Sequence, residues 1–260
     1  MFLTKVSKAF LAACILSASF LFASGAQAQK LPLEGYQLDV GLSPAPPFVI
    51  IEGEFQNVSG IDVDIILELQ KRLGFKLTEN RIFPDAFPEG MERVRTGKAD
   101  ILGGGVSYTV ARTEEFDFSP IYYESSLALL YSKKYNPDIK TLIDIKGKTI
   151  GVQMGSTSEH YANMFHATPV TFNNVMLAYF QVARGKMDGI IFDRPEVADF
   201  ARVMPALDLA ITNDTFGADD CQFALLLTKD SPYREIIAYT MEQMFMDGTI
   251  DSIKAKWRAK

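Results

Sequence analysis

Cysteine and histidine are scarce in this chain of 260 residues, which holds only two of each. Two cysteines, Cys14 and Cys221, cannot form the network of several disulfides that staples many small secreted domains. The two histidines, His160 and His166, are six residues apart, with no cluster of cysteines or carboxylates around them. This arrangement does not match the ligand spacing of metal sites. The sequence therefore predicts no metal centre and a fold stabilised by apolar burial.

Basic segments are missing as well. The chain has 26 Lys and Arg against 32 Asp and Glu, a formal net charge of −6, with no basic run or stripe. This balance excludes the electrostatic footprint of a nucleic-acid-binding protein and of a protein that docks on anionic lipid. Low-complexity tracts, detectable repeats and Pro/Gly/Ser-rich linkers are absent too. The length allows one large domain or two modest ones.

The first residues have the order of a secretory signal peptide. Lys5 and Lys8 give a positive start, residues 9–23 are apolar, and Ala26-Gln27-Ala28 is an A-x-A cleavage signal. We expect cleavage after Ala28 and exclude residues 1–28 from the fold. A rival interpretation takes residues 11–14 as a lipobox ending at Cys14, but few apolar residues precede Cys14 and the apolar run continues past it.

Cleavage at Ala28 changes the composition of what remains. Residues 29–260 number 232 and hold 24 Lys and Arg against 32 Asp and Glu, a net charge of −8. Cys221 becomes the single cysteine, so no intramolecular disulfide is possible, and we expect it to be buried and inert.

Strand and helix patterns alternate along the rest of the chain. Residues 61–73, for example, carry an apolar helical stripe that ends at Gly74. Strands separated by helices predict parallel sheets, and two such sets predict two α/β lobes. The expected strands are 37–42, 75–81, 99–102, 126–132, 149–153, 170–172, 188–192 and 223–228, and the expected helices are 61–73, 88–96, 158–165, 174–184, 233–247 and 249–257.

A glycine loop with one arginine follows the third expected strand. The run of residues 100–120 is DILGGGVSYTVARTEEFDFSP, with glycines at 103–105. Glycines let a ligand approach backbone N–H groups, and Ser107 and Thr109 add hydroxyl donors. Arg112 adds a planar fork that fits a carboxylate. The segment matches neither a Walker loop nor a dinucleotide fingerprint, so we expect a receptor for a small carboxylate and no cofactor.

Several segments, in their order and spacing, resemble the periplasmic solute-binding proteins of ABC importers, polar amino-acid class. The resemblance covers nearly all of the chain after the leader. The segments are Pro47-Phe48, Gly60-Ile61-Asp62-Val63-Asp64, Gly97-Lys98-Ala99-Asp100, Arg112 with residues 116–122, residues 147–152, Gly155-Ser156-Thr157, Gly185-Lys186-Met187-Asp188, Asp193, Asp247-Gly248-Thr249 and Lys256-Trp257.

The resemblance implies two Rossmann-like α/β lobes joined by a two-segment hinge, the type II periplasmic-binding fold. Lobe 1 would hold residues 29–122 and 217–260, lobe 2 would hold 127–212, and the hinge would be 123–126 and 213–216. It also implies a monomer in the periplasm that closes on one amino acid and docks on an ABC permease.

The resemblance assigns roles around the ligand's two charged groups. Arg112, with the backbone N–H groups at Ser107 and Thr157, would bind the α-carboxylate. Asp193 and the carbonyl of Gly105 would bind the α-ammonium. A zwitterion needs both a fixed cation and a fixed anion, because burying either charge unpaired is costly. Ser156 lies beside Thr157, at the start of a helix whose dipole would favour the carboxylate.

The expected side-chain pocket is less typical of that family. Phe87 falls at a position where an aromatic ring stacks on the ligand, and Gln153 and Phe192 flank the lobe 2 side. Leu42 stands where receptors for basic amino acids carry an acid, and Ala45 replaces a second aromatic. We therefore expect a ligand with an uncharged side chain.

Simpler interpretations exist for the same residues. Arg112 could be a surface ion-pair partner, Asp193 and Thr157 helix caps, and Phe87 part of the core. Asp62 is expected to be a solvent-facing or capping residue, like Asp64.

An enzymatic alternative lies on the same fold. Periplasmic cyclohexadienyl dehydratases need a general acid to expel hydroxide from a bound carboxylate, and Glu159 is the candidate here. A sensory binding protein is a third possibility. The paired Arg112 and Asp193 favour a non-enzymatic binding protein.

Overall fold

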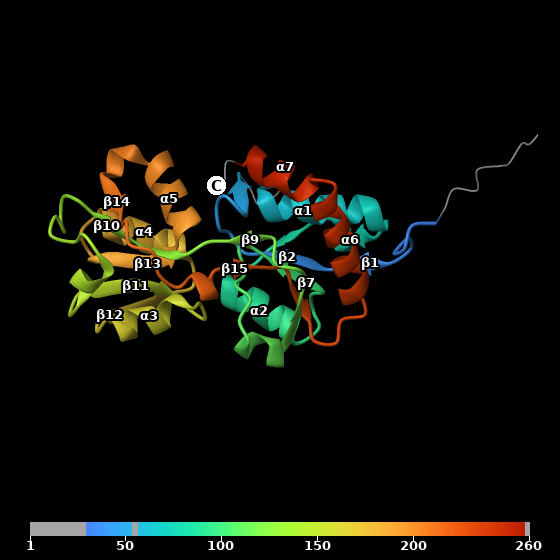
Figure 1. Ribbon diagram of the computed structural model, residues 1–260, viewed down its shortest axis with the longest axis horizontal. Coiled ribbons are helices and arrows are strands. Elements are labelled where there is room, and N and C mark those ends of the chain that lie inside the picture. Colours follow the sequence, from blue (N-terminus) through green and yellow to red (C-terminus); the bar gives the residue numbers. More distant parts are fainter. Residues whose placement is uncertain (1–29, 54–56, 258–260) are drawn as a thin grey trace, which may run out of the picture. The chain divides into compact units, whose positions relative to one another are not determined.

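Two five-stranded sheets organise the chain in the computed structural model, which describes residues 30–53 and 57–257 (Figure 1). The signal peptide, its cleavage site and the alternative lipobox at Cys14 lie outside the described residues.

The first sheet is built from strands far apart in the sequence. Its order is β6-β2-β7-β16-β8. The central strands β2 and β7 are buried at every position, as expected for a sheet covered on both faces. The bounds are β2 (Val40–Leu42), β6 (Phe83–Pro84), β7 (Ile101–Gly103), β8 (Phe116–Phe118) and β16 (Leu226–Thr228).

The second sheet comes from one continuous stretch and has the order β12-β11-β13-β10-β14. Its middle strands β10 and β13 are also buried throughout. The bounds are β10 (Leu127–Ser132), β11 (Thr149–Gln153), β12 (Thr168–Phe172), β13 (Gly189–Asp193) and β14 (Leu209–Ile211).

Both sheets are mixed, which corrects the prediction of parallel sheets. Strand β16 runs antiparallel to β7 and β8, and β10 runs antiparallel to β13 and β14. Parallel neighbours need a crossover connection, usually a helix. Neither β10 nor β16 is preceded by such a helix, because each follows a segment that runs between the two sheets.

The helices form largely where the apolar periodicity predicts them. Helix α1 buries Ile61, Ile65, Ile66 and Leu69, and Gly74 ends it in the left-handed conformation with φ 82°. The sequence allows either Asn173 or Asn174 as the cap of α4, and the Asn174 side chain is the one that accepts a hydrogen bond from the Met176 N–H. The bounds are α1 (Ile61–Leu73), α2 (Phe87–Arg95), α3 (Ser158–Met164), α4 (Val175–Ala183), α5 (Arg194–Val203), α6 (Arg234–Met246) and α7 (Thr249–Lys256).

Two expected strands are shorter than predicted. Residues 37–42 split into β1 (Gln37–Leu38), which pairs with β5 (Lys76–Leu77), and β2 in the first sheet. The expected strand 75–81 ends after β5, because Glu79 and Asn80 adopt left-handed φ of 53° in a 3-10 turn. A separate antiparallel two-stranded ribbon pairs β3 (Ile50–Glu52) with β4 (Asn57–Ser59).

Two short segments connect the sheets. The two connections pair with each other: β9 (Tyr123–Glu124) of the first pairs with β15 (Gln222–Phe223) of the second, and the Ser125 N–H donates to the Cys221 carbonyl at 2.9 Å. Near the second sheet, the Leu127 N–H donates to the Phe216 carbonyl at 2.8 Å. These lie within or beside the segments 123–126 and 213–216 expected to form a hinge, whose exact limits and motion stay a prediction.

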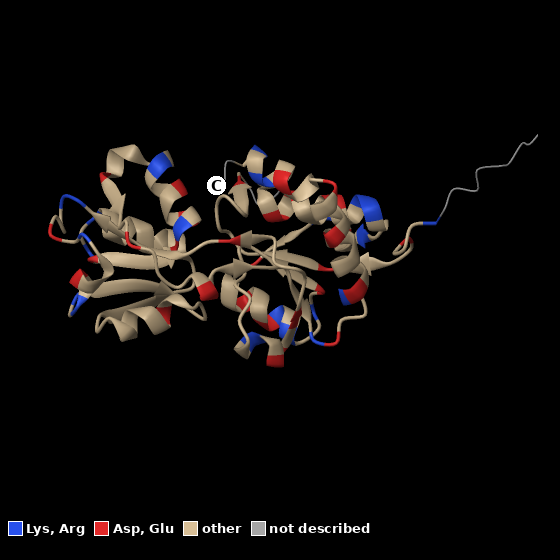
Figure 2. Cartoon of the chain, viewed as in Figure 1, with Lys and Arg blue, Asp and Glu red and all other residues tan. Residues whose placement is uncertain are grey.

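Basic and acidic residues are interspersed on the helices that lie around the two sheets (Figure 2). Within the described part of the chain, no helix is both long and apolar enough to span a bilayer.

Candidate functional site

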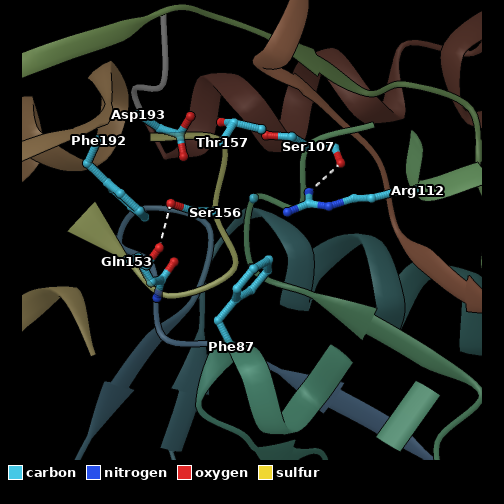
Figure 3. A pocket seen from close by; sticks show the side chains of 10 residues that line it. Phe87, Ser107, Arg112, Gln153, Ser156, Thr157, Phe192 and Asp193 are labelled. Atoms are coloured by element: carbon cyan, nitrogen blue, oxygen red, sulfur yellow. Dashed lines mark hydrogen bonds between the residues drawn. The ribbon is translucent and has the colours of Figure 1, made fainter. Parts of the chain in front are cut away.

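The glycine loop after β7 positions the only arginine that lines the pocket described below. Arg112 lies in a 3-10 turn (Ala111–Glu114), and its Nη1 donates to the Ser107 carbonyl at 2.7 Å. Its Nη2 donates to the Gly155 carbonyl at 2.9 Å, in the loop that precedes α3. The guanidinium therefore bridges the loops at the carboxyl ends of β7 and β11, one from each sheet (Figure 3).

A pocket of about 290 Å³ of empty space opens beside this guanidinium. It contains nine of the ten residues that the sequence singled out, and Gly104 completes the wall. The lining residues are Phe87, Gly104, Gly105, Ser107, Arg112, Gln153, Ser156, Thr157, Phe192 and Asp193.

Leu42 does not line this pocket, so its predicted place in the wall is corrected. It is fully buried in β2. Leu42 pairs with Gly103 in the sheet register, and a Cβ on Gly103 would lie 2.7 Å from Leu42 Cδ2, so the leucine packs against this glycine from the neighbouring strand. The leucine therefore supports the loop from the core.

Phe87 serves the core and the pocket together. Its side chain is 6% exposed and packs with Val94 and Leu102. The Arg112 guanidinium carbon lies 5.5 Å from the centroid of the Phe87 ring, within cation–π range (Figure 3). The ring thus limits where the guanidinium can lie.

The opposite wall comes from the loop after β11. The Ser156 hydroxyl donates to the Gln153 carbonyl at 2.8 Å, which closes this turn. Thr157 occupies the residue before α3, yet its side chain makes no capping hydrogen bond. The simple helix-cap interpretation of Thr157 therefore has no support in this geometry.

Asp193 ends β13, and its carboxyl feels the positive charge of Arg112. Its side chain makes no capping bond to α5, and it is 8% exposed. Burial raises the pKa of this carboxyl to about 7, although a hydrogen bond from Cys221 and the Arg112 charge favour the ionised form. The thiol of the buried Cys221, expected to be inert, donates to Asp193 Oδ1 at 3.2 Å and so holds the carboxylate in place.

Glu196 is a site residue that sequence reasoning missed. It lies in the first turn of α5, is 2% exposed, and neither carboxyl oxygen has a hydrogen-bond partner among the described residues. Glu196 Oε1 lies close to the glycine loop, since a Cβ on Gly105 would be 2.9 Å from it. Burial, reinforced by the charge of Asp193, raises the pKa of Glu196 well above its usual value. The three-residue spacing from Asp193 on one helix face was the available signal.

Asp62 was expected to face solvent, and this was wrong. It is fully buried, and its carboxylate accepts from the N–H groups of Gly104 at 2.6 Å and Gly105 at 3.2 Å, and from the Tyr122 hydroxyl at 2.6 Å. Burial raises the Asp62 pKa to about 6, although the three hydrogen bonds favour the ionised carboxylate and lower the pKa. Asp64, by contrast, is a partly exposed partner of Lys256 and Trp257. Asp62 therefore pins the glycine loop to α1.

We expect Asp62→Ala to lower the free energy of unfolding by roughly 3 kcal/mol or more, because it leaves three buried donors unpaired. Asp64→Ala, on the same helix, should cost about 1 kcal/mol or less, since its ion-pair partner is exposed. Urea unfolding of both variants checks this. Equal losses for the two would contradict the loop-pinning role of Asp62.

Comparisons with known proteins identify the family and the fold. The sequence profile described as bacterial extracellular solute-binding proteins, family 3, matches residues 38–260. The ABC transporter arginine-binding protein 1 of Escherichia coli (strain K12) is 27% identical over 93% of this chain and 96% of its own length.

Solved structures share the fold. An ancestral arginine-binding protein bound to glutamine superposes with a TM-score of 0.78 at 29% identity, covering 86% of this chain and 98% of that one. The ancestral amino acid-binding protein AncCDT-1, a precursor of cyclohexadienyl dehydratase, gives a TM-score of 0.72 at 28% identity, covering 85% and 94%. The predicted two-lobe α/β periplasmic-binding fold is confirmed.

Proposed function

Because the chain belongs to the bacterial extracellular solute-binding proteins, family 3, we propose that it captures a free α-amino acid for an ABC importer. The observation that carries this proposal is that one pocket is lined by a half-buried guanidinium, Arg112, and a buried carboxyl, Asp193. The two groups line one pocket and carry the opposite charges that a small zwitterion requires.

Each charged end of the ligand has its receptor in this proposal. The α-carboxylate takes the Arg112 fork and the backbone N–H groups of Ser107 and Thr157, and Ser156 borders it. The α-ammonium takes Asp193 and the Gly105 carbonyl. Since Arg112 Nη2 at present donates to the Gly155 carbonyl, the ligand carboxylate would compete for a donor that is already oriented.

Lobe closure supplies the binding step. Lobe 1 (29–122 and 217–260) and lobe 2 (127–212) would close about the segments 123–126 and 213–216, which shields the ion pairs from water. The pocket draws its walls from loops of both sheets, which supports this motion. The protein would act as a monomer in the periplasm after cleavage at Ala28 and deliver its solute to the permease subunits, without catalysis.

The ligand's side chain is uncharged in this proposal. The pocket contributes Phe87, Phe192 and the Gln153 amide around the expected side-chain position, and Arg112 is its only lysine or arginine. A second carboxylate on the ligand would therefore lack a cation. Leu42, at the position where the resemblance implies an acid in receptors for basic amino acids, offers no anion.

A thermal-shift panel of the refolded mature protein tests the proposal. Refolding removes any ligand carried through purification. One α-amino acid at about 1,000 times its dissociation constant should add about 4 kcal/mol of stability, a large rise in melting temperature. The rise should vanish in Arg112→Ala. A panel in which no amino acid raises the melting temperature would contradict the proposal.

Glu196 favours one second candidate, a dehydratase acting on prephenate or arogenate. Such an enzyme needs a carboxylic acid that stays protonated until it donates to the departing hydroxyl. Neither glutamate lines the pocket wall, but burial favours this protonated form of Glu196 close to Gly105, whereas Glu159 is partly exposed. Loss of added prephenate, abolished by Glu196→Gln with folding intact, would establish this function and displace simple capture.

A further inference from the structure

A second cavity lies next to the pocket and is larger, with about 450 Å³ of empty space. The two share Gln153, whose side chain borders both. Their walls also meet at two other places. Ala86 of the second wall directly precedes Phe87 of the first. Ser43 of the second wall lies against Gly104 of the first, because a Cβ added to Gly104 would be 2.4 Å from the Ser43 carbonyl oxygen. The two cavities are therefore neighbours, with Gln153 at their common border.

The polar groups of the second cavity are acceptors and amides. Asp85, Asn173, Asn174 and Ser43 line it, and no lysine or arginine does so among the described residues. The side-chain oxygen of Asn174 already accepts a hydrogen bond from the Met176 N–H, so its amide nitrogen is the group that can still bond a ligand. The cavity thus offers nothing that would neutralise a terminal carboxylate.

Asp85 is the strongest acceptor in that wall. Arg93 bonds one of its oxygens through Nη1 and bonds Asp39 through Nη2, so one guanidinium is shared between two carboxylates. The other Asp85 oxygen has no protein donor among the described residues. Burial raises the pKa of Asp85 although Arg93 favours its ionised form. A ligand N–H group would satisfy this oxygen.

We infer that the second cavity is the subsite for the distal end of the ligand, with Asp85 selecting an extended side chain that ends in an N–H donor, such as a carboxamide or ureido group, and rejecting a carboxylate. The inference rests on the proposed capture of an amino acid and adds the class of side chain. That the ligand's side chain is uncharged follows from the proposed function. That its end carries an N–H donor follows from the acceptor Asp85 in the cavity wall.

Matched ligands test the subsite by isothermal titration calorimetry on the refolded mature protein. Glutamine and glutamate differ only in the terminal group, and citrulline has arginine as its cationic isostere and norleucine as an apolar control. We expect glutamine or citrulline to bind at least about tenfold more tightly than glutamate and norleucine, the range for a bond to a charged acceptor. A tenfold preference for arginine over citrulline would overturn the neutral terminal group.

Variants localise the effect. Asp85→Asn should reduce the glutamine-over-glutamate ratio about tenfold, while Asp39→Asn, which removes a carboxylate from the same Arg93 outside the cavity, should leave it within twofold. Asn173→Leu, at an exposed lining position that tolerates substitution, should weaken long ligands and spare alanine. Wild-type ratios in Asp85→Asn together with unchanged long-ligand affinity in Asn173→Leu would overturn the subsite. Failure of every amino acid to bind would instead overturn the proposed function.

Discussion

Replacing Arg112 by alanine is expected to abolish capture while leaving the fold intact. Removing one partner of a buried, hydrogen-bonded charge pair costs about 2–5 kcal/mol, so affinity should fall by at least ~30-fold. In the ligand-free protein the guanidinium bonds only two backbone carbonyls, Ser107 and Gly155, so little else depends on it. Isothermal titration with the tightest amino acid of the panel, together with thermal melts, measures both effects.

Arg95→Ala is the matched control for that experiment. Arg95 also carries a guanidinium, but it pairs with its helix neighbour Glu92 at the surface and is 49% exposed. We expect its affinity to equal that of the wild type. Binding at wild-type strength by Arg112→Ala would mean that the carboxylate is held elsewhere.

Affinity is also expected to fall as the pH is lowered below 7. The Asp193 pKa is raised to about 7 by burial, so below that pH the carboxyl is protonated and a proton must leave before an ammonium can bind. Each pH unit below 7 should then cost about tenfold in affinity, or about 1.4 kcal/mol. Titrations between pH 5 and 8, in buffers of different ionisation enthalpy, should show about one proton released per ligand near pH 5.5.

The stability of the ligand-free protein should change in the opposite sense. The folded pKa of Asp193, about 7, exceeds the ordinary aspartate value of 3.8, so the folded state takes up the proton. That contribution is fully present below pH 3.8 and is lost as pH rises toward 7. Glu196→Gln should keep the pH midpoint of binding, because the protonated acid and the amide are both neutral. Affinity that stays flat from pH 5 to 8 would contradict the role of Asp193.

Local sequence patterns were sufficient for the elements that form the pocket's frame. The apolar stripe of 61–73, the glycine at 74 and the cap at Asn174 each specify a helix boundary through nearby groups. Arg112 and Asp193 were proposed as partners because the family resemblance assigns them to opposite ends of one ligand. That each follows a buried strand agrees with the assignment, since ligands bind at strand ends in α/β sheets.

Buried polar networks were not predictable in this way. Asp62 follows a helix start, where acidic side chains are usually solvated, and only the packing of α1 against the glycine loop buries it. Glu196 has the same local signature, and its burial depends on the approach of α5 to Gly105 from the other sheet. Leu42 shows the reverse error, since its register places it beside Gly103 in the sheet rather than in the pocket. Each case is decided by contacts between residues distant in the sequence.

A crystal structure of the refolded protein with its tightest amino acid would test the central claim most directly. We expect the ligand's carboxylate within hydrogen-bonding distance of the Arg112 guanidinium and its ammonium within hydrogen-bonding distance of the Asp193 carboxylate. A ligand bound in the reverse orientation, or outside the pocket lined by these two residues, would contradict it.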